Sequence, residues 1–133
     1  MTELASIVIF TERLEESVAF YRCLGFPLDD EDHGDGFVHA AGEMGAVHVA
    51  VLPASAPGDT AAWRAAGSTF VGLWVSSLDE AMAAVESFGA EVLRAHQQCE
   101  WGCRFVIADP DGRAVEVNQR EHCPTLPGSD PGQ

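Results

Sequence analysis

The sequence predicts an α+β fold made of two copies of one module, in which a strand is followed by a helix and then by a run of strands. The first reason is an internal repeat: residues 14–19 match residues 78–83 at an offset of 64, and Gly25 falls on Gly89 at the same offset. The second reason is that short runs of β-branched and aromatic residues stand before and after each helical pattern. Two copies are too few for a solenoid, which needs three or more repeats.

The first module opens with a strand and a helix. Residues 6–10 form a run rich in β-branched residues that is too short for a buried helix. Arg13 stands at the N-cap position of the following helix and offers the backbone no acceptor, so we expect a weakly held start. This helix has one apolar face, made of Leu14, Val18, Tyr21 and Leu24. After the helix, two strands at residues 36–41 and 46–52 are predicted on either side of a turn at residues 42–45.

The second module repeats this order. Residues 70–75 read as a strand, and Ser77 with Glu80 forms a capping box at the start of the next helix. Gly89 supplies the left-handed residue that ends it. This pattern predicts a helix with one apolar stripe, made of Leu78, Ala81, Met82, Val85 and Phe88.

The last two strands are predicted at residues 104–108 and 113–118. Between them, residues 109–112 read Asp-Pro-Asp-Gly, whose proline and glycine satisfy the backbone of a tight turn. The connector between the modules is rich in Ala, Pro, Gly and Ser, and a helical turn is compatible with residues 61–66.

These elements give one domain over residues 1–121. Its modules span about residues 4–52 and 69–119, and residues 53–68 link them. The tail at residues 122–133 is rich in proline and glycine, and we expect it to be flexible. A chain of 133 residues has the length of a single domain, and its 47% hydrophobic residues suffice for a core without disulfides.

The charge of the chain bears on its partners. Twenty-one acidic and seven basic residues give a formal net charge of -14, which repels phosphate backbones and anionic lipid surfaces. We therefore expect no nucleic acid and no membrane among its partners, and we expect cations to be attracted. Residues 29–35 add five carboxylates in one short stretch, which either steers a cationic ligand or only keeps a surface loop solvated.

The expected compartment is the cytoplasm, because the chain has neither a run of about 18 apolar residues nor a basic, then apolar, secretory start. The four cysteines are then expected to be reduced thiols. Their spacing is not that of paired zinc ligands, so we expect no zinc site at His96, Cys99, Cys103, His122 and Cys123.

Side chains alternate along strands, so each predicted strand has a face toward a helix and a face away from it. The faces toward the helices are uniformly aliphatic. The opposite faces mix aromatic, small and polar groups, which is typical of a small-molecule cleft. A plainer interpretation stays open, in which the aromatic residues belong to a core and His48 and Glu116 satisfy each other. The opposite faces carry Ser6, Val8, Phe10, His48, Ala50, Phe70, Gly72, Trp74, Ala114, Glu116 and Asn118.

Residues 11–26 and 99–116 resemble the two signatures of the vicinal oxygen chelate superfamily, which includes glyoxalase I, extradiol dioxygenases and bleomycin resistance proteins. The resembling features are Phe20-Tyr21 before Leu24-Gly25-Phe26, and Trp101-Gly102 with Asp109-Pro-Asp-Gly before Glu116. The resemblance implies a pair of βαβββ modules whose curved mixed sheet surrounds a ligand cleft. It also implies a homodimer, for which the exposed edges of small sheets give a physical reason.

Metal-using members of this superfamily hold a divalent ion with one side chain from each of four strands. The matching places in this chain are Ser6, His48, Phe70 and Glu116. Only His48 and Glu116 are competent ligands, whereas a catalytic ion commonly needs three. We therefore expect no metal and no other cofactor; any ion would have to use His48 and Glu116.

In character the chain is most similar to the metal-free bleomycin resistance proteins, which sequester a cationic aromatic antibiotic. This resemblance implies a binding protein of the antibiotic-resistance type whose ligand is a cationic aromatic drug or natural product. The alternative is an enzyme of the same superfamily, a lyase, isomerase or dioxygenase, that uses a metal or acid and base groups; whether the chain catalyses a reaction stays open. The expected ligand-binding residues are Ser6, Phe10, His48, Phe70, Trp74, Trp101 and Glu116.

Overall fold

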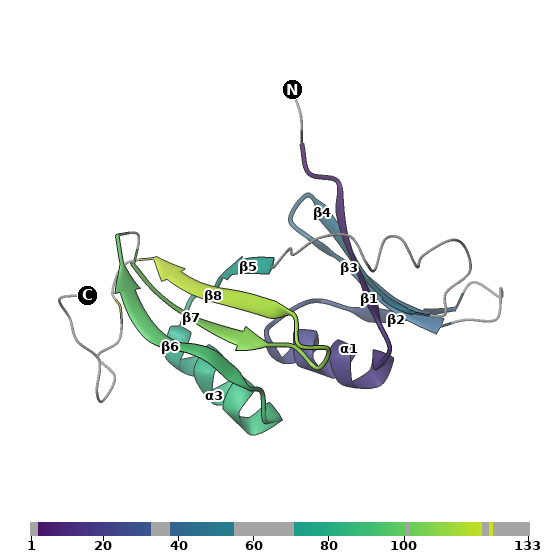
Figure 1. Cartoon of the computed structure of the whole chain (residues 1–133). Coiled ribbons are helices and arrows are strands. Elements are labelled where there is room, and N and C mark those ends of the chain that lie inside the picture. Colours follow the sequence, from purple (N-terminus) through teal and green to yellow (C-terminus); the bar gives the residue numbers. More distant parts are fainter. Residues whose placement is uncertain (1–2, 33–37, 55–70, 101, 121–122, 124–133) are drawn as a thin grey trace. The chain divides into compact units, whose positions relative to one another are not determined.

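The computed structural model describes residues 3–32, 38–54, 71–100, 102–120 and 123. It divides the chain into two compact units, Met1–Gly67 and Ser68–Gln133. Within the described residues, each unit contains a four-stranded mixed sheet and one helix, in the order strand, helix and three strands (Figure 1). The predicted α+β fold of two βαβββ modules is therefore confirmed.

In the first unit, the parallel pair joins β1 to β4, and the remaining pairs are antiparallel. The strands lie in the order β1-β4-β3-β2. This places the first and last strands of the module side by side, and α1, β2 and β3 connect them along the chain. The elements are β1 (Ser6–Thr11), α1 (Leu14–Cys23), β2 (Asp29–Asp32), β3 (Val38–Met44) and β4 (Val47–Pro53).

The second unit has the same topology, with the strands in the order β5-β8-β7-β6. Here β5 and β8 are parallel, and β8, β7 and β6 are joined by antiparallel pairs. The elements are β5 (Val71–Trp74), α3 (Leu78–Phe88), β6 (Val92–Cys99), β7 (Gly102–Ala108) and β8 (Ala114–Arg120).

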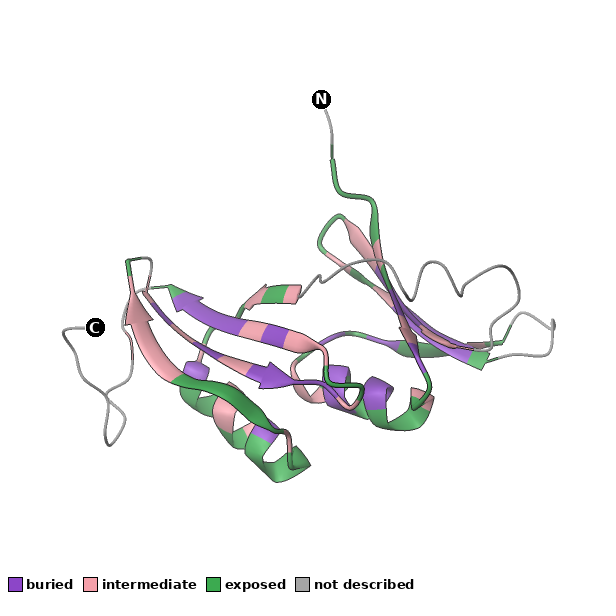
Figure 2. Ribbon diagram, viewed as in Figure 1, coloured by how far each residue is buried: buried purple, intermediate pink, exposed green. Residues whose placement is uncertain are grey.

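Burial alternates along the strands as the sequence predicts (Figure 2). In β7 and β8 the fully buried positions are aliphatic, aromatic or thiol side chains, which form the apolar layer of the second unit. In the first unit the buried rings of Phe20 and Tyr21 meet edge to face, with centroids 5.1 Å apart. The buried positions of β7 and β8 include Cys103, Phe105, Ile107, Val115 and Val117.

The two helices begin differently. The Ser77 hydroxyl accepts the Glu80 N–H at 3.2 Å and Gly89 has a φ of 89°, so the predicted Ser77 cap and the predicted glycine at the end of α3 are confirmed. At α1, the N-cap Arg13 makes no side-chain cap, as expected. Its own N–H is instead accepted by the Thr11 hydroxyl at 2.9 Å, and this hydroxyl also lies 2.9 Å from that of Ser17. The start of α1 is thus held by a residue of the preceding strand.

The predicted turn at residues 42–45 is wrong. β3 continues to Met44, and the turn consists of Gly45, whose φ is 61°, and Ala46. Gly42 lies inside β3, next to the Pro27 carbonyl. A Cβ at Gly42 would lie 1.8 Å from the Pro27 oxygen, so this position requires glycine. Gly42 therefore allows the close approach of two chain segments and does not form a turn.

Two strands were not predicted individually. β2 consists of four acidic residues with low strand propensity, and β6 contains two register shifts against β7. The strand predicted at residues 70–75 is present as β5, although residue 70 itself lies outside the described residues. The predicted helical turn at residues 61–66, most of the linker and nearly all of the tail also lie outside them.

Cys23, Cys99, Cys103 and Cys123 are all free thiols in the structure. Among the described residues, no helix has the length and apolar character needed to cross a membrane.

Candidate functional site

The sheet face opposite α3 in the second unit carries most of its polar side chains. The turn at Asp109 and Gly112 aligns β7 with β8, so Arg104 lies opposite Asn118 and Val106 lies opposite Glu116. Residues directly opposite in an antiparallel pair share a face. β5 extends this face, because Gly72 pairs with Glu116 and Trp74 pairs with Asn118. We call this surface the polar face; it consists of Gly72, Trp74, Arg104, Val106, Ala114, Glu116 and Asn118.

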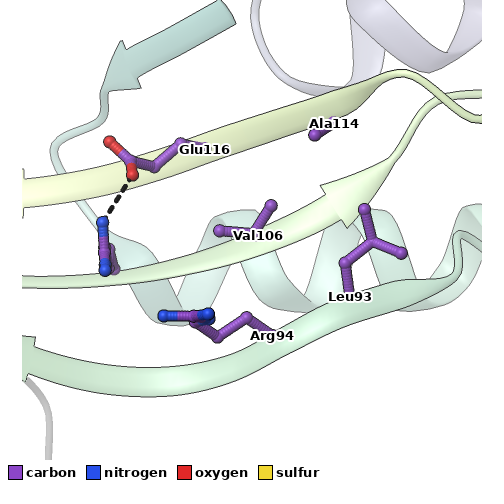
Figure 3. A pocket seen from close by; sticks show the side chains of 6 residues that line it. Leu93, Arg94, Val106, Ala114 and Glu116 are labelled. Carbon is purple, nitrogen blue, oxygen red and sulfur yellow. Dashed lines mark hydrogen bonds and ion pairs between the residues drawn. The ribbon is translucent and has the colours of Figure 1, made fainter. Parts of the chain in front are cut away.

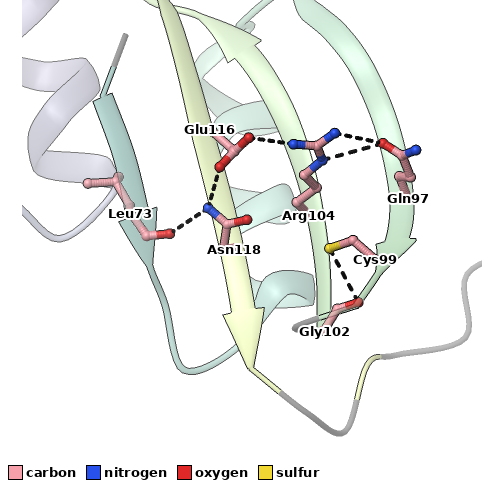
Figure 4. A network of polar contacts seen from close by, with 7 residues as sticks. All are labelled: Leu73, Gln97, Cys99, Gly102, Arg104, Glu116 and Asn118. Atoms are coloured by element: carbon pink, nitrogen blue, oxygen red, sulfur yellow. Dashed lines mark hydrogen bonds and ion pairs between the residues drawn. The ribbon is translucent and has the colours of Figure 1, made fainter.

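A chain of hydrogen bonds crosses all four strands of this sheet (Figure 4). Arg104 Nη1 donates to Glu116 Oε2 at 2.7 Å, and Asn118 Nδ2 donates to Glu116 Oε1 at 2.9 Å. On one side, Asn118 Nδ2 also donates to the Leu73 carbonyl at 3.2 Å. On the other side, Arg104 donates to Gln97 Oε1 from Nε at 3.3 Å and from Nη2 at 3.2 Å. The network fixes the positions of the carboxylate and the guanidinium.

The central ion pair is shielded from water. The side chains of Arg104 and Glu116 are 22% and 16% exposed. Partly buried charges are costly unless they are paired and hydrogen-bonded, and here both carboxylate oxygens accept from the protein. Glu116 therefore brings a charge that is already compensated within the protein.

A cavity of about 320 Å³ lies beside this pair (Figure 3). Its volume falls at the lower end of ligand pockets, which span roughly 300–1,000 Å³. The apolar part of the wall comes from β6, β7 and β8, and the polar part consists of two arginines and one glutamate. The cavity is lined by Leu93, Arg94, Arg104, Val106, Ala114 and Glu116.

The sequence-predicted residues of the first unit lie on neighbouring strands. Ser6 is exposed and pairs in register with half-buried His48, and Phe10 is half-buried farther along β1. His48 Nδ1 lies 2.5 Å from Glu43 Oε1 on β3, which is also its register partner. The structure thus brings Ser6 and His48 together and adds a carboxylate that the sequence analysis did not name.

In the second unit, the structure places Trp74 and Glu116 on the polar face. Trp74 is 50% exposed, and the guanidinium carbon of Arg120 lies 3.9 Å from the centroid of its ring. Phe70 and Trp101, the other two predicted site residues, lie outside the described residues.

The donors around Glu116 do not fit a divalent metal ion. A guanidinium occupies one carboxylate oxygen at 2.7 Å, and an amide donor occupies the other. In the first unit, Ser6 beside His48 offers only a hydroxyl, a poor ligand for a catalytic ion. The described part of the chain contains no group of three or more His, Cys, Asp or Glu side chains arranged for a metal.

Three polar residues of this site were not predicted from the sequence: Arg94, Gln97 and Arg104. For Arg104 a signal exists, because counting residues back from the turn at 109–112 places it on the same face as Glu116. For Arg94 and Gln97 the register shifts in β6 break such a count. Their place on the face follows only from the structure.

The thiol of Cys103 is buried on the other face of β7, toward α3. Burial, followed by a hydrogen bond and negative charge from Cys123 and further charge from Cys99 and Asp79, raises the pKa of Cys103 to about 12. At neutral pH this thiol is protonated, so it offers no nucleophile and no soft metal ligand.

Comparison with known proteins places this fold and site in context. Residues 3–117 match the family model described as the Glyoxalase/Bleomycin resistance protein/Dioxygenase superfamily. A protein of Mycolicibacterium smegmatis described as uncharacterized is 30% identical over 114 residues, which cover 85% of this chain and 90% of that protein.

Solved structures show the same fold. The crystal structure of TioX from Micromonospora sp. ML1 has a TM-score of 0.67 and 23% identity, over 90% of this chain and 99% of that one. A lactoylglutathione lyase from Agrobacterium tumefaciens has a TM-score of 0.62 and 19% identity, over 90% of this chain and 94% of that one. From the family match over nearly its whole length, the chain belongs to the glyoxalase/bleomycin resistance protein/dioxygenase superfamily.

Proposed function

We propose that this chain is a small-molecule binding protein that needs no metal ion and takes its ligand into the cavity beside Arg104 and Glu116. The observation that carries this proposal is the cavity itself. It combines an apolar wall with a few polar groups, which is the usual composition of a ligand site, and two of these groups, Arg104 and Glu116, are held in position by hydrogen bonds. Groups that are already fixed lose little conformational freedom on binding, and this favours affinity.

The absence of a metal requirement is supported by the neighbours of Glu116. A metal ion at this carboxylate would have to displace the Arg104 guanidinium, and the displaced cation would remain close to the ion. Both the lost ion pair and the repulsion between the two cations disfavour such an exchange.

The ligand predicted from the sequence is a cationic aromatic drug or natural product, held as an antibiotic-resistance protein holds its antibiotic. One observation supports an aromatic cation near this sheet. The exposed ring of Trp74 has the Arg120 guanidinium over its face, and such a ring attracts cations by about 0.5–2 kcal/mol. A ligand cation would have to replace Arg120 there.

An enzyme of the same superfamily is the alternative, and one observation favours it. The contact between His48 Nδ1 and Glu43 Oε1 orients the imidazole, and an imidazole held by a carboxylate is a common general base. For an enzyme of this kind, His48→Ala would abolish turnover; for a binding protein, it leaves binding at the second-unit cavity unchanged.

The proposal is tested by filling the cavity. Ala114→Trp and Val106→Phe place bulk at two lining positions, and Val92→Trp places it at an exposed position of β6 that does not line the cavity. Each variant is checked for folding by circular dichroism, and compound binding is followed by thermal shift after dialysis against EDTA.

We expect compounds that stabilise the chelator-treated wild type to stabilise Val92→Trp equally and to lose their effect on both filled variants. Binding that requires added metal, or that survives both fillings in folded protein, contradicts the proposal.

A further inference from the structure

The cavity has a positive balance of charge in a strongly acidic chain. Its wall contains two guanidinium groups, those of Arg94 and Arg104, and one carboxylate, that of Glu116. Arg104 and Glu116 neutralise each other through the contact at 2.7 Å. The net charge of -14 therefore does not describe the surroundings of this cavity.

Arg94 supplies the uncompensated charge. It lies on β6 opposite Val106 of β7, and it has no ion-pair or hydrogen-bond partner among the residues that the structure describes. Figure 3 shows its side chain lying along the cavity wall between β6 and β7. A guanidinium binds planar oxyanions through two parallel N–H donors, so an unpaired arginine at a cavity wall is suited to a carboxylate.

The other walls indicate what the rest of the ligand is like. Leu93, Val106 and Ala114 contribute apolar surface within the same cavity. Burying an apolar group on this surface adds affinity in proportion to the area removed from water. An apolar body with one anionic group matches both parts of the wall.

We propose that the cavity binds small organic anions, with an apolar body against Leu93, Val106 and Ala114 and a carboxylate on Arg94. This inference rests on the proposed binding function, and for this cavity it replaces the cationic ligand predicted from the sequence with an anionic one. Arg104 contributes a second guanidinium to the same wall, and its bonds to Gln97 and Glu116 hold it in position. Glu116 keeps Arg104 in place and does not itself meet the ligand's charge.

The test uses three probes of one shape and different charge: naphthalene-2-carboxylate, naphthalene-2-carboxamide and 2-naphthylmethylammonium. Affinities are measured by isothermal titration calorimetry on the full chain in EDTA. We expect the carboxylate to bind about tenfold more tightly than the amide, and the ammonium most weakly, because a charge-assisted pair adds more than a neutral hydrogen bond.

The assignment to Arg94 is tested with Arg94→Gln and a matched control, Arg13→Gln. Arg13 is an exposed arginine of the first unit, so the control removes the same charge elsewhere. We expect Arg94→Gln to abolish the preference for the carboxylate over the amide while the amide's own affinity stays unchanged. The control should keep the wild-type preference.

The outcomes separate the inference from the proposed function. Equal binding of all three probes, tightest binding of the ammonium, or a carboxylate preference that survives Arg94→Gln overturns the inference and leaves a binding protein. Failure of all three probes to bind the wild type overturns the proposed cavity and the inference with it.

Discussion

Arg104 and Glu116 form an ion pair on the face of the second sheet opposite α3, with Arg104 Nη1 2.7 Å from Glu116 Oε2. Glu116 is one of the two residues that the sequence offers as a metal ligand or as an anchor for a cationic ligand. The pair gives the carboxylate a structural partner instead, and leaves the nearby Arg94 as the charge available to a ligand.

The first prediction is that Glu116→Gln raises, and does not lower, the affinity for an anionic ligand. Removing this negative charge should strengthen naphthalene-2-carboxylate binding by about threefold, because the anion then faces two guanidinium groups with no nearby carboxylate. The measurement is calorimetric titration, and Glu86→Gln on the exposed side of α3 is the control of equal charge. If Glu116 itself anchors a cationic ligand, the carboxylate affinity stays the same and the affinity for 2-naphthylmethylammonium falls.

The second prediction concerns the turn that aligns β7 with β8. The buried Asp109 carboxylate accepts the Asp111 and Arg113 N–H groups at 3.0 and 2.9 Å and pairs with the Arg113 guanidinium. Asp109→Ala should lower the free energy of unfolding by about 1–3 kcal/mol, since it leaves these donors unpaired. Urea denaturation measures this loss. Asp111→Ala removes a carboxylate that is 3.9 Å from the Arg113 guanidinium and accepts neither turn N–H in place of Asp109, so it should cost much less; equal losses would contradict this role of Asp109.

The third prediction follows from the pKa of Cys103, which is raised from 9.0 to about 12, mainly by burial. The unfolded chain loses this proton above about pH 9 while the folded chain keeps it. The contribution of Cys103 to stability is therefore complete below pH 9 and falls as pH rises toward 12.

Urea denaturation at pH 8 and pH 10.5 measures this effect. Between these pH values the wild type should lose about 1–2 kcal/mol more stability than Cys103→Ala. Val117→Ala, a buried change without a titrating group, should show the pH dependence of the wild type. An identical pH dependence in wild type and Cys103→Ala would count against the raised pKa.

The fourth prediction is the homodimer. The edge strands are β1 and β2 in the first sheet and β5 and β6 in the second. Edge strands have unpaired backbone N–H and C=O groups, which proteins commonly cover with another chain or element. Sedimentation velocity should show a mass of two chains in the micromolar range. A single species at 14.2 kDa across that range would overturn the prediction.

The sequence predicts the order of the elements because each helix is marked by its own apolar stripe and end signals. It misses β2, whose residues 29–32 are all acidic. Pairing with β3 and the contact of Arg22 Nη2 with Asp30 Oδ1 at 3.2 Å hold this segment as an edge strand despite its low propensity.

The site is predicted less completely than the fold. Strand alternation correctly places Glu116 and Trp74 on the same face, but it cannot show that Arg104 and Asn118 satisfy both oxygens of Glu116. That depends on register and side-chain geometry, and the irregular register of β6 hides Arg94. The net charge of -14 is likewise a sum over the whole chain, so it does not give the sign of the charge inside one cavity.

The central claim is that a ligand binds in the cavity of the second unit without a metal ion. The most direct measurement is a titration of isotope-labelled full chain with naphthalene-2-carboxylate in EDTA, followed by backbone amide NMR. We expect saturable shifts concentrated at residues 93–94, 104–106 and 114–116, which line the cavity or lie directly beside its lining residues. Binding that leaves these amides unshifted, or that appears only after a divalent metal is added, would contradict it.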